Sequence, residues 1–268
     1  MRNSRDLKLN MAKIHPTALV SPGAQLADDV EIGPYSIIGE RVSIGAGTVV
    51  GPHVVIEGVT RIGRNNRFHS GGAIGCAPQD KKYRDEPTEL VIGDGNTFFQ
   101  NVTIATGTAQ DQGLTRIGDD NWVMAYAHIA HDCVMGSHII LANGATLAGH
   151  VEVGDHVILG GLSAVHQFCV IGAHAMGGGG AMINQDVPPF VMCEGNRAVA
   201  RGLNTEGMKR RGFTPEQISS VKQVYKLLYR EGLSYDEACG RIREMAKNEP
   251  ALDLFVDFFA RSKRGIVR

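Results

Sequence analysis

The chain has few aromatic residues, no paired cysteine motif and no long apolar run. Aromatic residues make up 6% of its 268 residues, and there is a single tryptophan. The five cysteines are odd in number and include no CxxC pair, which argues against a disulfide framework and a thiolate zinc site. No apolar stretch is long enough to cross a bilayer, and the charged N-terminus lacks the apolar core of a secretory signal. These absences predict a cytoplasmic protein with reduced cysteines and no membrane span.

The common phosphate-binding and nucleophile motifs are also missing. No Walker loop, GxGxxG, GxSxG or HExxH sequence occurs, so the chemistry has to be sought among the ten histidines. The net charge of −1 hides an uneven distribution, because residues 196–268 carry 15 Lys and Arg against 9 Asp and Glu, a balance of about +6. Such a basic segment attracts acidic partners, and by itself leaves nucleic acid, acidic proteins and anionic lipids open.

Glycine, by contrast, is abundant and is part of a six-residue repeat. There are 34 glycines, about 13% of the chain against a usual ~7%. Every sixth residue is apolar across 14–74; the frame resumes over 92–104 and, shifted by one residue, over 117–183, where only Gly177 breaks it. A period of six fits neither a helix nor a lone strand and indicates a parallel β-helix. Each hexad supplies one short strand and one corner, and three hexads close a triangular coil of 18 residues.

We therefore predict a left-handed parallel β-helix, a hexapeptide-repeat prism, followed by a small α-helical C-terminal domain. The left hand is that of known hexapeptide proteins. The predicted boundaries are an N-terminal extension over 1–13, the prism over 14–190 and the helical domain over 191–268. Two interruptions of the frame, 76–91 and 105–116, are predicted to project as loops, where function often concentrates.

Two capping boxes carry the prediction of helices. Thr-Pro-Glu-Gln at 214–217 and Ser-Tyr-Asp-Glu at 234–237 each precede apolar residues at helical spacing. A last helix is expected near 251–263. We expect these helices to cover one open end of the prism, which would otherwise expose unpaired strand edges.

The 18-residue coil also groups candidate catalytic residues. Gly149 and Gln167 follow His131 by 18 and 36 residues, so the three form one stacked column, with His150 and His166 as immediate neighbours. A histidine suits a general base that takes a proton from an attacking hydroxyl at neutral pH. The glycine N–H can hold the oxyanion that develops on an acyl carbon. Asp132, next to His131, can orient or support the imidazolium.

Two other interpretations stay open on these residues. Histidines from neighbouring prisms bind zinc in some proteins, and His128 with His131 offers two ligands, which would suit a metal-dependent hydratase. A non-catalytic spacer or binding prism would not need the histidine column at all.

The hexads alone indicate only a broad fold group, whereas six other segments are far more specific. Together they resemble the family of acyl-[acyl-carrier-protein]–UDP-N-acetylglucosamine O-acyltransferases, over nearly the whole chain. The segments are AHIAHDC (127–133), LAGH (147–150), AVHQF (164–168), IGAH (171–174), QDVPPF (185–190) and GLNTEGMKRRGF (202–213).

The resemblance implies an activity and partners. The family transfers a (R)-3-hydroxyacyl group from acyl carrier protein to the 3-hydroxyl of UDP-N-acetylglucosamine, the first step of lipid A biosynthesis, in a homotrimer with active sites between prisms. Because the thioester is already activated, neither a metal nor a cofactor is implied. The acidic carrier protein, rather than nucleic acid, then becomes the expected partner of the basic C-terminal segment. A related N-acyltransferase acting on a UDP-amino sugar is the nearest enzymatic alternative, although it usually carries an N-terminal domain before the repeat.

The resemblance also implies roles for individual residues. His131 matches the general base, Asp132 its support and Gly149 the oxyanion donor, while Gly179 matches the position that limits the acyl pocket. Other residues match positions that contact substrate: Gln79, Asp80, Lys82, His128, His150, His166 and Gln167. Four more match positions on the nucleotide side of the site, contributed by the adjacent subunit: Asn204, Glu206, Arg210 and Arg211.

Overall fold

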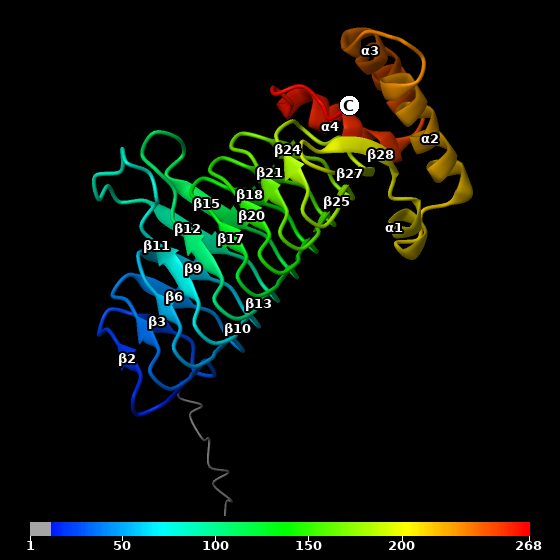
Figure 1. Ribbon diagram of the computed structural model, residues 1–268. Coiled ribbons are helices and arrows are strands. Elements are labelled where there is room, and N and C mark those ends of the chain that lie inside the picture. The colour runs from blue at the N-terminus through cyan, green and yellow to red at the C-terminus, as the bar shows by residue number, and fades with distance from the viewer. Residues whose placement is uncertain (1–11) are drawn as a thin grey trace, which may run out of the picture.

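The computed structural model describes residues 12–268 and shows the predicted left-handed parallel β-helix with helices at its C-terminal end (Figure 1). Three sheets form the sides of the prism. The first sheet contains β1 (Lys13–Ile14), β4 (Glu31–Ile32), β7 (Val49–Val50), β10 (Arg67–Phe68), β13 (Thr97–Phe98), β16 (Trp122–Val123), β19 (Ile140–Leu141), β22 (Ile158–Leu159), β25 (Met176–Gly177), β27 (Val191–Glu194) and β28 (Val199–Leu203).

The second and third sheets complete each coil. The second contains β2 (Leu19–Val20), β5 (Ile37–Ile38), β8 (Val55–Ile56), β11 (Ala73–Cys76), β14 (Thr103–Ala105), β17 (His128–Ile129), β20 (Thr146–Leu147), β23 (Ala164–Val165) and β26 (Met182–Ile183). The third contains β3 (Gln25–Leu26), β6 (Val42–Ile44), β9 (Val59–Ile62), β12 (Glu89–Ile92), β15 (Leu114–Ile117), β18 (Val134–Met135), β21 (Glu152–Val153) and β24 (Val170–Ile171).

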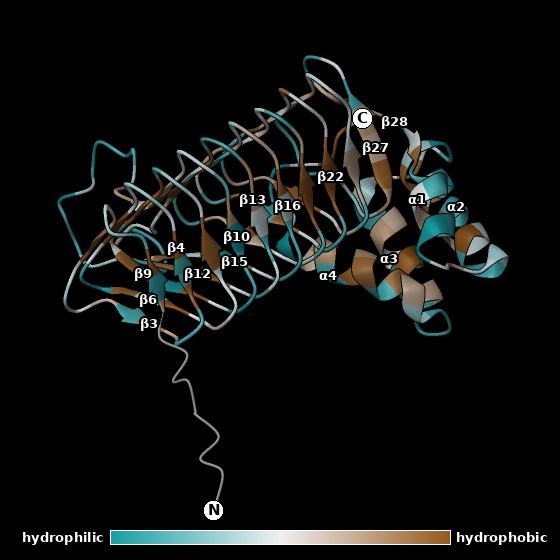
Figure 2. Ribbon diagram, turned by 90° about the horizontal axis from the view of Figure 1, so that it is seen from below, coloured by the Kyte–Doolittle hydropathy of each residue, from teal (hydrophilic) through white to brown (hydrophobic). Residues whose placement is uncertain are grey.

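The apolar residue of each hexad points into the prism, as the period predicts. From Ile32 onward these side chains are buried, and Phe68 and Phe98 stack inside with ring centroids 4.8 Å apart. Burying such a side chain stabilises the fold by about 1.5–3 kcal/mol. Figure 2 shows how apolar residues recur along the strands around the prism.

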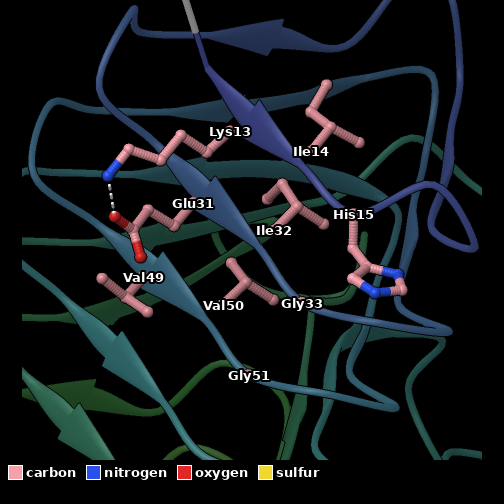
Figure 3. Close-up of a pocket in the computed structure, with 9 residues that line it drawn as sticks. All are labelled: Lys13, Ile14, His15, Glu31, Ile32, Gly33, Val49, Val50 and Gly51. Atoms are coloured by element: carbon pink, nitrogen blue, oxygen red, sulfur yellow. Dashed lines mark hydrogen bonds and ion pairs between the residues drawn. The ribbon is translucent and has the colours of Figure 1, made fainter.

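The first coil differs because no coil covers it on its outer side in residues 12–268. Ile14 is 45% exposed, although it stacks on Ile32 as the repeat predicts. Figure 3 shows this end of the prism, where a shallow hollow of about 420 Å³ lies beside the ion pair of Lys13 and Glu31, 2.6 Å apart. We interpret the hollow as the open end of the prism.

The two predicted loops project from the prism but are shorter than their predicted bounds of 76–91 and 105–116. They run from 77 to 88 and from 106 to 113, because β12 and β15 extend the third sheet on their C-terminal sides. The loops lengthen two coils, so Ile62 pairs with Ile92 and Ile92 with Ile117. This explains the one-residue shift of the repeat.

The C-terminal helices are α1 (Thr205–Arg210), α2 (Pro215–Tyr229), α3 (Tyr235–Ala246) and α4 (Asp253–Arg261), with a 3-10 turn at Pro250–Leu252. Both predicted capping boxes are present at the starts of α2 and α3. The structure differs from the predicted boundary at 190, since β27 continues the first sheet and β28 pairs with it antiparallel. This hairpin lacks the six-residue period, so the repeat could not predict it. None of the helices in residues 12–268 is long and apolar enough to span a membrane.

A buried carboxylate attaches the chain's C-terminal tail to the prism. Asp186 is fully buried and accepts hydrogen bonds from the backbone N–H groups of Val170, Lys263 and Arg264 and from the Ser262 hydroxyl, all within 2.9 Å. Four donors compensate the cost of burying this charge. The helical domain is therefore tied to the last coils of the prism.

Candidate active site

The predicted histidine column exists and lies at the corner between the second and third sheets. Parallel pairing of β17, β20 and β23 keeps an 18-residue register, which stacks His131, Gly149 and Gln167 on successive coils. The next residue at each corner adopts a left-handed backbone conformation, with φ of 57° at Asp132, 61° at His150 and 64° at Phe168. This conformation turns the chain at the corner, and Asp and His accept it better than most residues.

His131 and Asp132 form a hydrogen-bonded pair that the second loop completes. His131 Nδ1 lies 2.8 Å from Asp132 Oδ2, and the Asp132 side chain is 1% exposed. Thr108 donates to the same carboxylate twice, from its N–H at 2.9 Å and its hydroxyl at 2.6 Å. Burial alone raises the pKa of Asp132, but the hydrogen bonds from His131 and Thr108 outweigh it and hold the pKa below its usual value. The carboxylate therefore stays ionised beside the imidazole.

The ring of His131 lies directly over Gly149. A Cβ added to Gly149 would come within 2.5 Å of His131 Cε1 and 2.8 Å of Nε2. Within residues 12–268, no backbone carbonyl or side chain accepts a hydrogen bond from the Gly149 N–H. A free donor beside the unpaired nitrogen of an imidazole is the arrangement that an oxyanion needs.

His150 is the second imidazole of the corner. Its ring meets that of His131 edge to face at 5.1 Å and stacks on Phe168 at 4.4 Å. Its Nδ1 lies 2.7 Å from Asp111 Oδ2, and its Nε2 lies 3.9 Å from Asp132 Oδ2.

The other residues predicted near the column are present at its edges. His128 Nδ1 lies 2.7 Å from the Thr103 hydroxyl, and burial, with a smaller effect of His131, lowers the pKa of His128. His166 and Gln167 are exposed one coil further on. The side chains of His166 and Gln167 are therefore accessible to a substrate.

Two predicted groups do not meet the column in one protomer. Gln79, Asp80 and Lys82 lie on the loop 77–88, and in residues 12–268 no hydrogen bond or ion pair joins them to the column. The second group is on or beside α1, which flanks the first sheet rather than the corner of the histidine column (Figure 1). It consists of Asn204, Glu206, Arg210 and Arg211.

A cavity separates α1 from the outer face of the first sheet. It measures about 530 Å³, and its sheet side is apolar whereas its α1 side carries the charges. Asn204 and Arg211 are anchored to the prism, donating to the carbonyls of His174 and His156 at 3.1 Å each. The lining residues are Ile140, Ile158, Met176, Met192, Leu203, Asn204, Thr205, Glu206, Gly207, Arg210 and Arg211.

Three further histidines form a stack that is structural. His138, His156 and His174 lie at the corner between the third and first sheets, with ring centroids 4.7–4.8 Å apart, and Phe190 continues the stack at 5.0 Å. Burial, with smaller effects of His156 and Arg211, lowers the pKa of His174 to about 4, so this ring is neutral at neutral pH.

The column also offers the residues that could hold a metal ion. In residues 12–268, His131, Asp132 and His150 form a group of three potential ligands whose ligand atoms lie within 4.8 Å of one another. His128, which the metal interpretation invoked, is not in this group. The Nδ1 atoms of both rings already face carboxylates, so the same contacts also suit a network that moves protons.

Sequence reasoning missed Thr103, Thr108 and Asp111, which contact the column from the preceding coil. Thr108 precedes Asp132 by 24 residues, because the loop 106–113 lengthens that coil beyond 18. The repeat of 18 therefore cannot identify it. The signal available was the loop itself, a polar interruption of an otherwise regular frame.

Comparisons with known proteins agree over nearly the whole chain. Residues 186–267 match the family model described as UDP-N-acetylglucosamine O-acyltransferase, domain 2, and residues 114–149 match that of the bacterial transferase hexapeptide. The chain is 56% identical to the acyl-[acyl-carrier-protein]–UDP-N-acetylglucosamine O-acyltransferase of Thiobacillus denitrificans and 53% identical to that of Halorhodospira halophila, over 96% of this chain and 100% of each relative. The solved UDP-N-acetylglucosamine O-acyltransferase of Moraxella catarrhalis superposes with a TM-score of 0.93 at 47% identity, over 95% of this chain and 99% of that one.

Proposed function

Because the chain belongs to the family of acyl-[acyl-carrier-protein]–UDP-N-acetylglucosamine O-acyltransferases, we propose that the corner of His131, Asp132 and Gly149 carries out the transfer. The protein is an acyltransferase of the first step of lipid A biosynthesis, acting from acyl carrier protein onto UDP-N-acetylglucosamine. The observation that carries the residue assignment is the His131 ring, held against the Gly149 backbone by the buried Asp132 carboxylate.

The proposed reaction moves one proton and exchanges one bond. His131 takes the proton of the sugar 3-hydroxyl, and the oxygen attacks the thioester carbonyl carbon. The Gly149 N–H donates to the oxyanion of the tetrahedral intermediate. When the C–S bond breaks, the imidazolium returns its proton to the leaving thiolate of the carrier protein. Asp132, ionised throughout, stabilises the imidazolium while the proton resides on it.

The position of α1 supports a site shared between protomers of a homotrimer. Arg210 and Arg211 lie beside the first sheet, whereas His131 lies at the corner between the other two sheets. Two arginines suit the diphosphate of the nucleotide sugar, since guanidinium groups bind phosphate oxygens in pairs. A neighbouring protomer's α1, facing the column, would bring both halves together. The loop 77–88, with Asp80 and Lys82, projects from the prism and is available to the same substrate.

The basic C-terminal segment and an apolar sheet face support binding of the acyl donor. The balance of about +6 over residues 196–268 suits docking of the acidic acyl carrier protein. We place the reaction in the cytoplasm, where thiols stay reduced, and all five cysteines are free. The apolar sheet face at Ile140, Ile158 and Met176 offers a surface for the acyl chain.

We expect the purified protein to acylate UDP-N-acetylglucosamine when it is incubated with (R)-3-hydroxyacyl carrier proteins of graded chain length, and we expect EDTA to leave the rate unchanged. The thioester needs no Lewis acid, and His131 and Asp132 together supply the base. Mass spectrometry of the acylated nucleotide sugar reports product and chain length together. No product with any donor, or activity that EDTA abolishes and zinc restores, would contradict this mechanism and favour a metal at His131, Asp132 and His150.

Replacing Gly179 with methionine should shift the preference toward shorter acyl chains. Gly179 is exposed, has no positive φ, and an added Cβ would meet only the Gly161 carbonyl at 3.6 Å, so the fold should accept a side chain. Each methylene of the acyl chain that loses its apolar contacts costs about 0.8 kcal/mol of binding. If the methionine displaces three or four methylenes of a long chain, the kcat/KM ratio of long to short donors falls by about 10²-fold. Competition between donors measures the ratio, with Gly179→Ala as the small-residue control. An unchanged ratio would remove Gly179 from the acyl pocket.

A further inference from the structure

Asp111, on the loop 106–113, contacts the second imidazole of the column. Its Oδ2 lies 2.7 Å from Nδ1 of His150, although the two residues are 39 apart in the sequence. Asp111 is not part of the six-residue repeat, because it lies in a loop that interrupts the repeat. The contact is therefore made by the loop and not by the stacking of coils.

We propose that Asp111 is a positioning residue, which orients His150 so that its Nε2 faces the reacting corner. The inference rests on the proposed function and deepens it. Asp111 accepts the Nδ1 proton, which selects the tautomer of the ring and directs the other nitrogen toward Asp132 and His131. His150 then presents a defined nitrogen to the substrate, next to the Gly149 N–H.

The surroundings of His150 leave this task to Asp111. Phe168 stacks flat on the ring at 4.4 Å, which fixes the plane of the imidazole but not its orientation within that plane. A half-turn of the ring about its bond to Cβ keeps the stack and changes which side of the corner each nitrogen faces. The charged and titratable groups facing the ring are Asp111, Asp132 and His131, and only Asp111 lies within hydrogen-bonding distance. This single bond distinguishes the two orientations.

A role in stability does not explain the contact. The Asp111 side chain is 41% exposed, and ion pairs with so exposed a partner add little to the stability of a fold. The loop is already fixed at its base, where the buried Thr108 donates twice to Asp132. The loop therefore contacts the two imidazoles by separate routes: through Asp132 to His131, and through Asp111 to His150. The second route can be removed without disturbing the first.

A double-mutant cycle tests the inference. Asp111→Ala should lower kcat/KM on the order of tenfold with an unchanged melting temperature, since a mispositioned group at the site lowers the rate without unfolding the protein. Asp111→Asn, which keeps an acceptor oxygen, should recover part of the rate. In a His150→Ala background, Asp111→Ala should have no further effect. Asp120→Asn is the matched control, because the Asp120 carboxylate lies 3.9 Å from His138 Nδ1 in the structural stack.

Nitrogen chemical shifts of ¹⁵N-labelled histidine provide a readout of the tautomer. His150, assigned by its loss in His150→Ala, should show one tautomer in the parent and a mixture in Asp111→Ala. The inference is overturned if Asp111→Ala has the full parental kcat/KM, or if its effect persists undiminished without His150. Such a result leaves the proposed function intact, because that depends on the separate outcome for His131→Ala.

Discussion

His131→Ala should lower kcat/KM by about 10²–10⁴-fold, the range that a general base contributes. Without this imidazole, the site loses the ring whose Nε2 lies over Gly149, where the hydroxyl proton is taken as the C–O bond forms. The melting temperature should change little. Asp132 keeps both hydrogen bonds from Thr108, and the His131 side chain is not part of the apolar interior of the prism. Steady-state kinetics with saturating (R)-3-hydroxyacyl carrier protein and varied UDP-N-acetylglucosamine measure the loss.

His15→Ala is a suitable control for the loss of an imidazole. His15 is exposed on the first coil, several coils from the column, and its Nδ1 pairs with the nearby Thr17 hydroxyl at 2.9 Å. It should keep the parental rate. A His131→Ala enzyme with activity close to that of His15→Ala would overturn the assignment of His131 as the base. The overall reaction would still stand, because it rests on the family to which the chain belongs.

The sequence predicted those parts of the site that lie on coils of constant length. His131, Gly149 and Gln167 follow one another at 18 residues, and the pairing of β17, β20 and β23 confirms that they stack. The arithmetic holds because each hexad closes one side of the prism, so residue number fixes the place on the coil. It needs no knowledge of side-chain contacts.

Where loops lengthen a coil, the same arithmetic gives no position. The coils that carry the loops span 30 residues from Ile62 to Ile92 and 25 from Ile92 to Ile117. Thr108 and Asp111 reach the column only because the loop folds back over the next coil, a path that depends on contacts rather than on period. A conformation of this kind is set by hydrogen bonds such as those of Asp132, which no repeat encodes.

The helical domain shows the same division between local and long-range information. Thr214 and Ser234 were predicted as N-caps because capping depends on residues three positions apart, and both capping boxes are present. The hairpin of β27 and β28 and the attachment of the tail through Asp186 were not predicted. The Asp186 carboxylate meets Ser262 across 76 residues, and nothing local in the sequence marks such a contact.

Gly149→Ala should lower kcat/KM by about 10²-fold or more while leaving the fold intact. Gly149 has no positive φ, so alanine is compatible with its backbone. The new methyl group would lie 2.5 Å from Cε1 of His131, and the atom that can give way is the imidazole itself. Displacing a reacting group by an ångström has a cost of about this size. Kinetics and a melting curve on the same preparation separate lost activity from lost structure.

A control variant and a double variant show how the added methyl group of Gly149→Ala acts. Gly72→Ala is the matched control, since a Cβ there meets its nearest neighbours at 3.5 and 3.6 Å, ordinary contact distances, on another coil of the prism. If alanine at 149 acts by moving the ring, it should have almost no effect when combined with His131→Ala, because the ring is already absent. If it instead obstructs the oxyanion, the double variant should be slower than His131→Ala alone. Parental activity in Gly149→Ala would mean that the added methyl group neither displaces the His131 ring nor obstructs the oxyanion, which would contradict a reaction at the close approach of His131 to Gly149.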